Sequence, residues 1–292
     1  MMNLAYLIPE RGYDFLRQLV GPLSDRGVKV WVDHVPAYAD LVLAAMLPAS
    51  PQWGTSILSS SKPYVLWHWD DYSFVDHGER RWRQFWEMLP GAADIWSCSY
   101  EVARSLKERH GLDSYIMPAW VVADHLEPVR PEDQGDYVLY ASSSASLGKR
   151  TDWADKACTL LGYRLEMTVG QALSRPAYLS LVRRCRLYLC TAFEESNGTI
   201  PAMEAAAAGR PVVITDLAAN REVFGSSTPG VYYFPPLDFR ALLDVLRAAW
   251  NASWAPVSQD LRQRILTHFD LPAVADRIHQ RLRYVSGFSA RV

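Results

Sequence analysis

Short apolar runs alternate with helix-like runs along almost the whole chain. The expected strands are 4–8, 28–32, 41–43, 64–67, 95–97, 115–117, 137–140, 164–169, 187–190, 212–215 and 232–234. The expected helices are 14–24, 79–88, 100–110, 152–161, 177–184, 239–250 and 272–284, with one more between Thr199 and Gly209. This alternation predicts an α/β protein in which parallel strands are flanked by helices.

The segment 118–135 interrupts the alternation and is the predicted linker. It holds Pro118, Pro128, Pro131 and Gly135 among mixed charges, and proline and glycine break helices and strands. A chain of 292 residues suits one large or two small domains. We therefore expect two α/β domains that meet near residue 127.

The composition is that of a globular protein with a sizeable core, because 49% of the residues are hydrophobic and 21% are charged. A net charge of −2 gives no overall attraction to nucleic acid or to an anionic membrane. No apolar run approaches 18 residues and no signal peptide opens the chain, so we expect a soluble, cytoplasmic protein without membrane insertion. Cys98, Cys158, Cys185 and Cys190 lack metal or redox spacing and are expected to be buried free thiols.

The segment 194–215 reads as a loop, a helix and a buried strand. Thr199 is placed to cap the helix, and Pro201 lies in its first turn, where a missing N–H has no cost. Gly209 ends the helix, and Pro211 prevents its continuation. The apolar run 212–214 is typical of a central parallel strand.

The start of this helix has the features of an anion site. Gly198, Thr199 and Ile200 present backbone N–H groups at the positive end of a helix dipole, which suits a phosphate. Glu204, about one turn further on, would repel a phosphate, but its carboxylate can accept hydrogen bonds from a vicinal diol such as ribose. The spacing fits a nucleoside diphosphate site, and equally a capped helix that carries one solvated glutamate.

The same segment resembles the signature of retaining GT-B glycosyltransferases, the family-four-like group called glycosyl transferases group 1. The matching positions are 200–205, Gly209, Pro211, Val212, Val213, 215–216 and 220–222. The resemblance implies that Glu204 binds the ribose of a sugar nucleotide and that Gly198, Thr199 and Ile200 face its diphosphate. The family has a further glutamate eight positions earlier, where this chain has Ser196. Either Glu195 takes that role through a one-residue bulge, or Ser196 and Asn197 contact the sugar.

The resemblance also implies the fold, which is the GT-B form of the α/β class. It has two Rossmann-like, doubly wound domains facing a cleft. Residues 1–127 would form the N-terminal, acceptor-side domain, and residues 128–271 the domain that binds the nucleotide sugar. The C-terminal helix within 272–292 would cross back onto the first domain.

Other positions of the family's pattern imply further site residues. Lys149 matches a lysine that binds the diphosphate, and Arg150 could replace an accompanying arginine that this chain lacks. His68 matches a histidine near the sugar and the acceptor, and Gly12 matches a glycine loop that approaches the ligand. The residues alone allow three other interpretations: a solvated loop lysine, a packed core histidine and a plain turn.

We therefore predict a metal-independent, retaining glycosyltransferase that uses a nucleoside-diphosphate sugar, with a UDP-sugar expected first. Its catalytic residues would be His68, Lys149 and Glu195. Its acceptor would be a glycan, or a hydroxymethylated base in phage-type DNA inside a host cytoplasm, which the arginine-rich segment 262–291 would suit. Two alternatives stay open: a sugar-nucleotide epimerase of the same fold, and a non-catalytic module that binds a nucleotide or a glycan.

Overall fold

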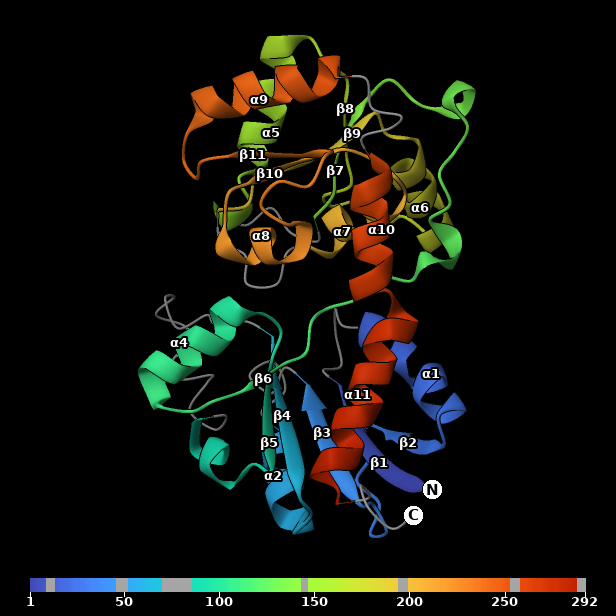
Figure 1. The fold of residues 1–292 in the computed structure, drawn as a ribbon, viewed down its shortest axis with the longest axis vertical. Coiled ribbons are helices and arrows are strands. Elements are labelled where there is room, and N and C mark those ends of the chain that lie inside the picture. The colour runs from blue at the N-terminus through green and yellow to red at the C-terminus, as the bar shows by residue number, and fades with distance from the viewer. Residues whose placement is uncertain are drawn as a thin grey trace. The chain divides into compact units, whose positions relative to one another are not determined.

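The computed structural model describes residues 1–8, 14–45, 52–69, 86–142, 147–193, 199–252 and 258–287. The chain forms two compact units: the first comprises Met1–Ala119 with Leu271–Val292, and the second comprises Trp120–Asp270. Each unit is built on its own parallel sheet with helices around it (Figure 1). The predicted α/β class is therefore confirmed. Among the described residues, no helix is both long and apolar enough to cross a membrane.

The first unit contains six parallel strands in the order β2-β1-β3-β4-β5-β6. They are β1 Met2–Leu7, β2 Val28–Val32, β3 Leu41–Ala45, β4 Tyr64–His68, β5 Asp94–Ser97 and β6 Tyr115–Ile116. The strand order changes direction at β1, because β2 pairs with one edge of β1 and β3 with the other. All residues of β3 and β4 are buried, as expected of central parallel strands covered on both faces.

Helices from both ends of the chain belong to the first unit. Those described are α1 Val20–Asp25, α2 Gln52–Ser60, α4 Tyr100–His110 and α11 Leu271–Val285. In α4 the Ser99 side chain accepts a hydrogen bond from the amide of Val102, and Gly111 ends the helix with a φ of 69°. In α11, Arg281 donates two hydrogen bonds of 2.7 and 2.9 Å to the carboxylate of Asp94. This ion pair fastens the C-terminal helix to the start of β5.

The second unit contains five parallel strands in the order β11-β10-β9-β7-β8. The strands are β7 Val138–Tyr140, β8 Leu165–Met167, β9 Leu187–Cys190, β10 Val212–Thr215 and β11 Val231–Phe234. The helices are α5 Thr151–Leu161, α6 Arg175–Arg184, α7 Ile200–Ala207, α8 Ala218–Phe224, α9 Phe239–Asn251 and α10 Ser258–Phe269. All neighbouring strands pair in parallel, so their carboxyl ends share one edge of the sheet.

Side chains of the second sheet alternate between two apolar cores. Leu139 and Ile214 contribute to a core that includes residues of α6, α7, α8 and α10. Val138 and Val213, their neighbours along the strands, contribute to a core that includes residues of α5 and α9. Figure 1 shows α5 and α9 on one side of this sheet and α7, α8 and α10 on the other. The helices thus bury both faces of the sheet, which removes apolar surface from water on each side.

Most of the predicted elements are confirmed, with ends that differ by one or two residues. The ranges predicted for β2, β9, β10 and α4 agree with the structure at both ends. The predicted helix 14–24 instead begins as a 3-10 turn, Asp14–Leu19, before α1. Most of the predicted helix 79–88 lies outside the described residues. Three helices are absent from those expected: α2, which is rich in serine, threonine and glycine, α8, and α10, which has few apolar residues.

The four cysteines are buried free thiols, as predicted. Burial raises the pKa of the Cys158 thiol and of the Cys185 thiol to about 12, from an ordinary value of 9.0. Since the thiolate is the reactive form, neither thiol should be labelled rapidly by a thiol reagent at pH 8 in the folded protein, whereas both should react in denaturant. Rapid labelling of either residue in the folded protein would contradict this prediction.

The raised pKa values also predict how stability depends on pH. The unfolded thiols ionise at a lower pH than the folded ones, so the free energy of unfolding that the two thiols contribute below pH 9 should be lost as the pH rises towards 12.

Leu246 of α9 is fully buried in the core beneath one face of the second sheet. Leu246→Ala should lower the free energy of unfolding by about 2–5 kcal/mol, because it removes buried apolar contacts and leaves a cavity. Leu160→Ala is a matched control on α5, since that side chain is 60% exposed, and should change stability by less than about 0.5 kcal/mol. Urea unfolding followed by circular dichroism would measure both. Equal losses in the two variants would contradict the packing of α9.

Candidate functional site

The candidate site of the second unit lies at the carboxyl edge of its sheet. The loop after β7 leads to Lys149, the segment after β9 leads to α7, and the loop after β10 begins with Asp216. Because all strands are parallel, these three segments leave the sheet at the same edge. Ligands of doubly wound sheets bind at this edge.

The start of α7 differs in one respect from the prediction. Thr199 occupies the N-cap position, but its side chain makes no capping hydrogen bond. Its hydroxyl instead lies 3.9 Å from the Sγ of Cys190, at the end of β9. The prediction that the Thr199 side chain caps the helix is therefore wrong. The Thr199 hydroxyl accepts no hydrogen bond from the first amides of α7. Pro201 lies in the first turn, and Gly209 follows the helix with a φ of 72°, as predicted.

Glu204 is the charged group at the centre of this site. It lies in α7 and is only 3% exposed. Its carboxylate is held by two residues of α6: Arg175 donates from Nη2 to Oε1, and the Tyr178 hydroxyl donates to Oε2 over 2.7 Å. The interpretation of Glu204 as a solvated residue is therefore wrong. Burial, and next the charge of Glu204, raise the pKa of Tyr178 well above its ordinary value, so this hydroxyl stays a donor.

Lys149 and Arg150 lie in the loop between β7 and α5, and hydrogen bonds hold the backbone of that loop. The Lys149 carbonyl accepts from the Tyr140 hydroxyl over 2.8 Å and from the Thr191 Oγ1 over 3.0 Å. Tyr140 ends β7 and Thr191 follows β9, so both neighbouring strands fix the position of Lys149. Arg150 has a left-handed conformation with a φ of 48°. The structure thus brings Lys149 to the same sheet edge as α7.

The guanidinium of Arg150 contacts residues in the first turn of α5. It donates to both carboxylate oxygens of Asp152 over 3.0 and 2.9 Å and lies 4.5 Å from the ring centre of Trp153. The hydrogen bond from Arg150 lowers the pKa of Asp152. A diphosphate would therefore compete with Asp152 for this arginine.

His68 belongs to the first unit, where it is the last residue of β4. It is 2% exposed, and its ring lies edge-on to Trp86 with 6.0 Å between ring centres. Trp86 in turn stacks on His110 at the end of α4. His68 therefore lies at the carboxyl edge of its own sheet within an aromatic cluster, and its contact with substrate stays a prediction.

Several of the predicted site residues lie outside the described part of the chain. They are Gly12, Glu195, Ser196, Asn197 and Gly198. The choice between Glu195 and Ser196 as the sugar-contacting residue therefore stays a prediction.

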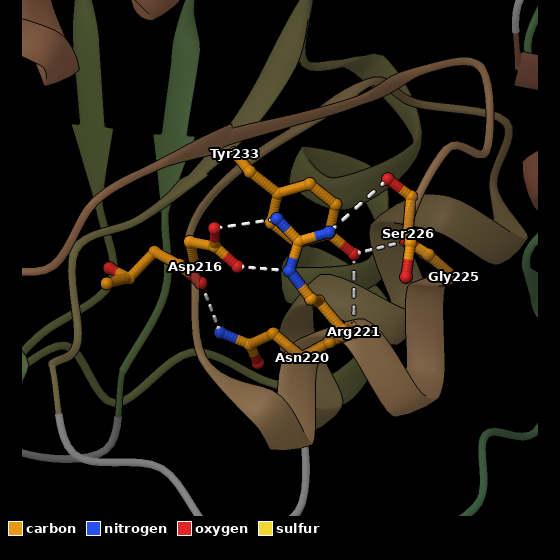
Figure 2. A network of polar contacts seen from close by, with 7 residues as sticks. Asp216, Asn220, Arg221, Gly225, Ser226 and Tyr233 are labelled. Atoms are coloured by element: carbon orange, nitrogen blue, oxygen red, sulfur yellow. Dashed lines mark hydrogen bonds and ion pairs between the residues drawn. The ribbon is translucent and has the colours of Figure 1, made fainter.

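A polar network holds the loop after β10 in place (Figure 2). Arg221 of α8 donates to both oxygens of Asp216 over 2.5 and 2.7 Å, and its guanidinium lies 4.7 Å from the ring centre of Tyr233. The Tyr233 hydroxyl donates to the Gly225 carbonyl over 2.6 Å. The side-chain nitrogen of Asn220 donates to the carbonyl of Thr215 over 2.8 Å. These bonds tie both ends of α8 to β10 and β11.

The sequence did not predict Arg175 or Tyr178 as site residues. A weak local signal was present, because Ser174 and Pro176 are typical of a helix start, and the Ser174 side chain does cap α6. The predicted helix began at residue 177 and so left Arg175 in a loop. Tyr178 lies 26 residues and Arg175 lies 29 residues before Glu204 in the sequence. Helix and strand periodicity cannot predict contacts over such separations.

Arginines of the basic C-terminal segment are used in internal contacts. Arg264 donates to the carbonyls of Val223 and Glu222, and Arg281 pairs with Asp94. These contacts fix α10 and α11 to their own units and leave fewer charges for an anionic partner. Within the described ranges, no group of three or more His, Cys, Asp or Glu side chains is arranged to hold a metal ion.

Comparison with solved structures identifies the architecture as the GT-B fold, with two Rossmann-like domains. Sucrose-phosphate synthase from Thermosynechococcus elongatus matches with a TM-score of 0.81 and 14% identity, over 99% of this chain and 100% of that one. HepE from Anabaena, solved with UDP and glucose, matches with a TM-score of 0.78 and 14% identity, over 97% and 100% of the two chains. A glycosyltransferase from Rickettsia africae matches with a TM-score of 0.70 and 9% identity, over 97% and 98%.

The sequence itself matches no protein-family model and no curated protein. The likeness to solved structures therefore establishes the fold, and the predicted resemblance in fold is confirmed. The assignment of an activity depends on the residues of the site.

The network around Tyr233 generates a prediction about stability. Tyr233→Phe should lower the free energy of unfolding by about 1 kcal/mol, because the partly buried Gly225 carbonyl loses its donor. Tyr232→Phe is the matched control on the same strand. The Tyr232 hydroxyl makes no hydrogen bond with the part of the chain that the structure describes, so this variant should be close to neutral. Urea unfolding of both variants measures the difference. A loss in Tyr232→Phe equal to that in Tyr233→Phe would contradict the importance of the network.

Proposed function

We propose that the protein is a retaining glycosyltransferase that transfers a sugar from a nucleoside-diphosphate sugar to an acceptor hydroxyl. The observation that carries this proposal is Glu204: a buried carboxylate on the helix that leaves the carboxyl edge of a Rossmann-like sheet. A carboxylate is an acceptor for the two hydroxyls of a ribose. The fold supports the proposal, since HepE of the same fold has been solved with UDP and with UDP-glucose. A UDP-sugar is therefore the first donor to test.

The diphosphate would be bound by groups on two segments. The amides of Thr199 and Ile200 lie at the positive end of α7. The sequence predicts that the amide of Gly198 would join them. Lys149 would supply a positive charge, supported by Arg150 once it leaves Asp152. Negative charge grows on the diphosphate as it departs in the transition state, and fixed donors and cations stabilise that charge.

The sugar would be read by Glu195, or by Ser196 and Asn197, and His68 would lie near the acceptor hydroxyl. Retention of configuration follows from the resemblance to retaining GT-B enzymes, in which the leaving diphosphate helps to take the acceptor proton. With protein groups around the diphosphate, the reaction would need no metal ion.

A glycan is the acceptor that the described surface favours. DNA binding depends on a set of cations that can reach phosphates. Arg264 and Arg281 are instead engaged with carbonyls and with Asp94, and the net charge is −2. Hydroxymethylated DNA should therefore be tested as an acceptor after neutral glycans.

The proposal predicts that one nucleotide will stabilise the folded protein through Glu204. A thermal-shift screen with UDP, GDP and ADP should give a clear rise in the unfolding midpoint for one of them. A ligand at about a hundredfold excess over its dissociation constant adds about 2.7 kcal/mol. Glu204→Gln should lose most of this rise, because an amide has one acceptor oxygen in place of two. Each shift is measured from the variant's own midpoint.

The matched control is Glu166→Gln, which removes a partly exposed carboxylate that is paired with Arg164 on the same unit. It should keep the full nucleotide shift. Absence of a shift with every nucleotide would count against the proposal, as would a shift that Glu204→Gln retains. Conversion of the sugar nucleotide to an isomer without an acceptor would instead identify an epimerase. Nucleotide binding without turnover over a panel of acceptors would identify a binding module.

A further inference from the structure

The two donors that hold Glu204 come from one face of α6. Arg175 is the first residue of this helix and Tyr178 lies three positions later, so both point to the same side. The Arg175 guanidinium lies 5.3 Å from the ring centre of Tyr178. Each residue donates to a different oxygen of the Glu204 carboxylate. The three side chains therefore form one unit, which we call the Glu204 cluster.

The two donors differ in their freedom to move. Tyr178 is partly buried and packs against the core formed by α6, α7 and the sheet. The Arg175 side chain is 47% exposed, although the carboxylate with which it pairs is only 3% exposed. An exposed arginine at the end of a helix can leave its partner for water, whereas a packed tyrosine cannot move without disturbing the core.

The geometry of a carboxylate shows what a diol would require. Each oxygen of Glu204 can accept about two hydrogen bonds, and the cluster uses one on each. A ribose would need one acceptor site on each oxygen, together with a path to them. At 3% exposure the carboxylate is covered, and the half-exposed Arg175 is the partner that can be displaced with least disruption.

We propose that Arg175 and Tyr178 set the affinity of Glu204 for ribose in opposite directions. Tyr178 is a positioning residue that fixes the orientation of the carboxylate. Arg175 competes with the diol for the carboxylate and is displaced when a nucleotide binds. This inference rests on the ribose-binding role proposed for Glu204 and adds two residues that the sequence did not predict.

The competition has a measurable consequence. The apparent affinity of a ligand falls by the fraction of protein in which its site is open. Arg175→Gln removes the ion pair, so UDP should bind about threefold to tenfold more tightly than to the wild-type protein. Tyr178→Phe should bind UDP about threefold to tenfold more weakly, because the carboxylate loses its fixed orientation. A nucleotide without ribose hydroxyls should show neither change.

The experiment is isothermal titration calorimetry with UDP and with 2′,3′-dideoxy-UDP. The proteins are the wild type, Arg175→Gln, Tyr178→Phe, Glu204→Gln and the control Arg183→Gln. Arg183 lies on the same helix and bonds to the carbonyl of Glu127, so its loss removes an equal charge at a distance from the cluster. Because UDP is an anion, this control gives the effect of charge alone. Arg175→Lys serves as a second variant that should fall between the wild type and Arg175→Gln, and it keeps the test valid if Arg175→Gln fails to fold.

Tighter UDP binding by Arg175→Gln and weaker binding by Tyr178→Phe, both absent with the dideoxy nucleotide, would establish the proposal. UDP binding by Arg175→Gln no tighter than by Arg183→Gln would overturn it, as would equal effects on both nucleotides. Either of these outcomes overturns only the competition by Arg175, provided that the wild type binds UDP and Glu204→Gln does not. The ribose-binding role of Glu204 then still stands. If neither the wild type nor Arg175→Gln binds UDP, GDP or ADP, both the ribose-binding role of Glu204 and the competition by Arg175 are overturned.

Discussion

Burial of both faces of two parallel sheets is the constraint on which the rest of this structure depends. Parallel strands need helical crossovers, and these crossovers cover the sheet on both sides. In the second unit this divides each strand between two cores, as Val138 and Leu139 show. The same arrangement brings every strand to an end at one edge. The loops that carry Lys149, the start of α7 and Asp216 therefore meet there, and the candidate site is a consequence of how the core is packed.

Two charged groups at that edge, Glu204 and Arg150, are paired within the protein, and the role proposed for each involves an exchange of partners. Glu204 would give up Arg175 for ribose, and Arg150 would give up Asp152 for a diphosphate. A buried carboxylate without a donor would be costly, so an unliganded site of this kind needs internal partners. Under the proposed function, nucleotide affinity would depend on the difference between internal and ligand contacts. That difference can be adjusted by exposed residues such as Arg175 without altering the core.

Structural likeness and site chemistry contribute separately to the functional proposal. Solved structures at 14% identity or less establish the GT-B fold, and a fold can host several activities. The ribose-binding role proposed for Glu204 depends on a carboxylate at a defined place on α7. The proposed acceptor contact involves the first unit, in which His68 and Trp86 form part of an aromatic cluster.

Local sequence determined the elements and the outline of the site, because their causes lie within a few residues. The range of β10 followed from its apolar run, and the end of α7 followed from Gly209, whose left-handed backbone suits glycine. The spacing of Glu204 from the helix start allowed either a ribose site or a solvated residue, and the family resemblance implied the ribose role. Only the tertiary structure decided what Glu204 contacts, because Arg175 and Tyr178 reach it from another helix. Packing likewise left Thr199 without a capping bond. Such contacts depend on how the helices pack on the sheet, and the local periodicity of the sequence does not predict that packing.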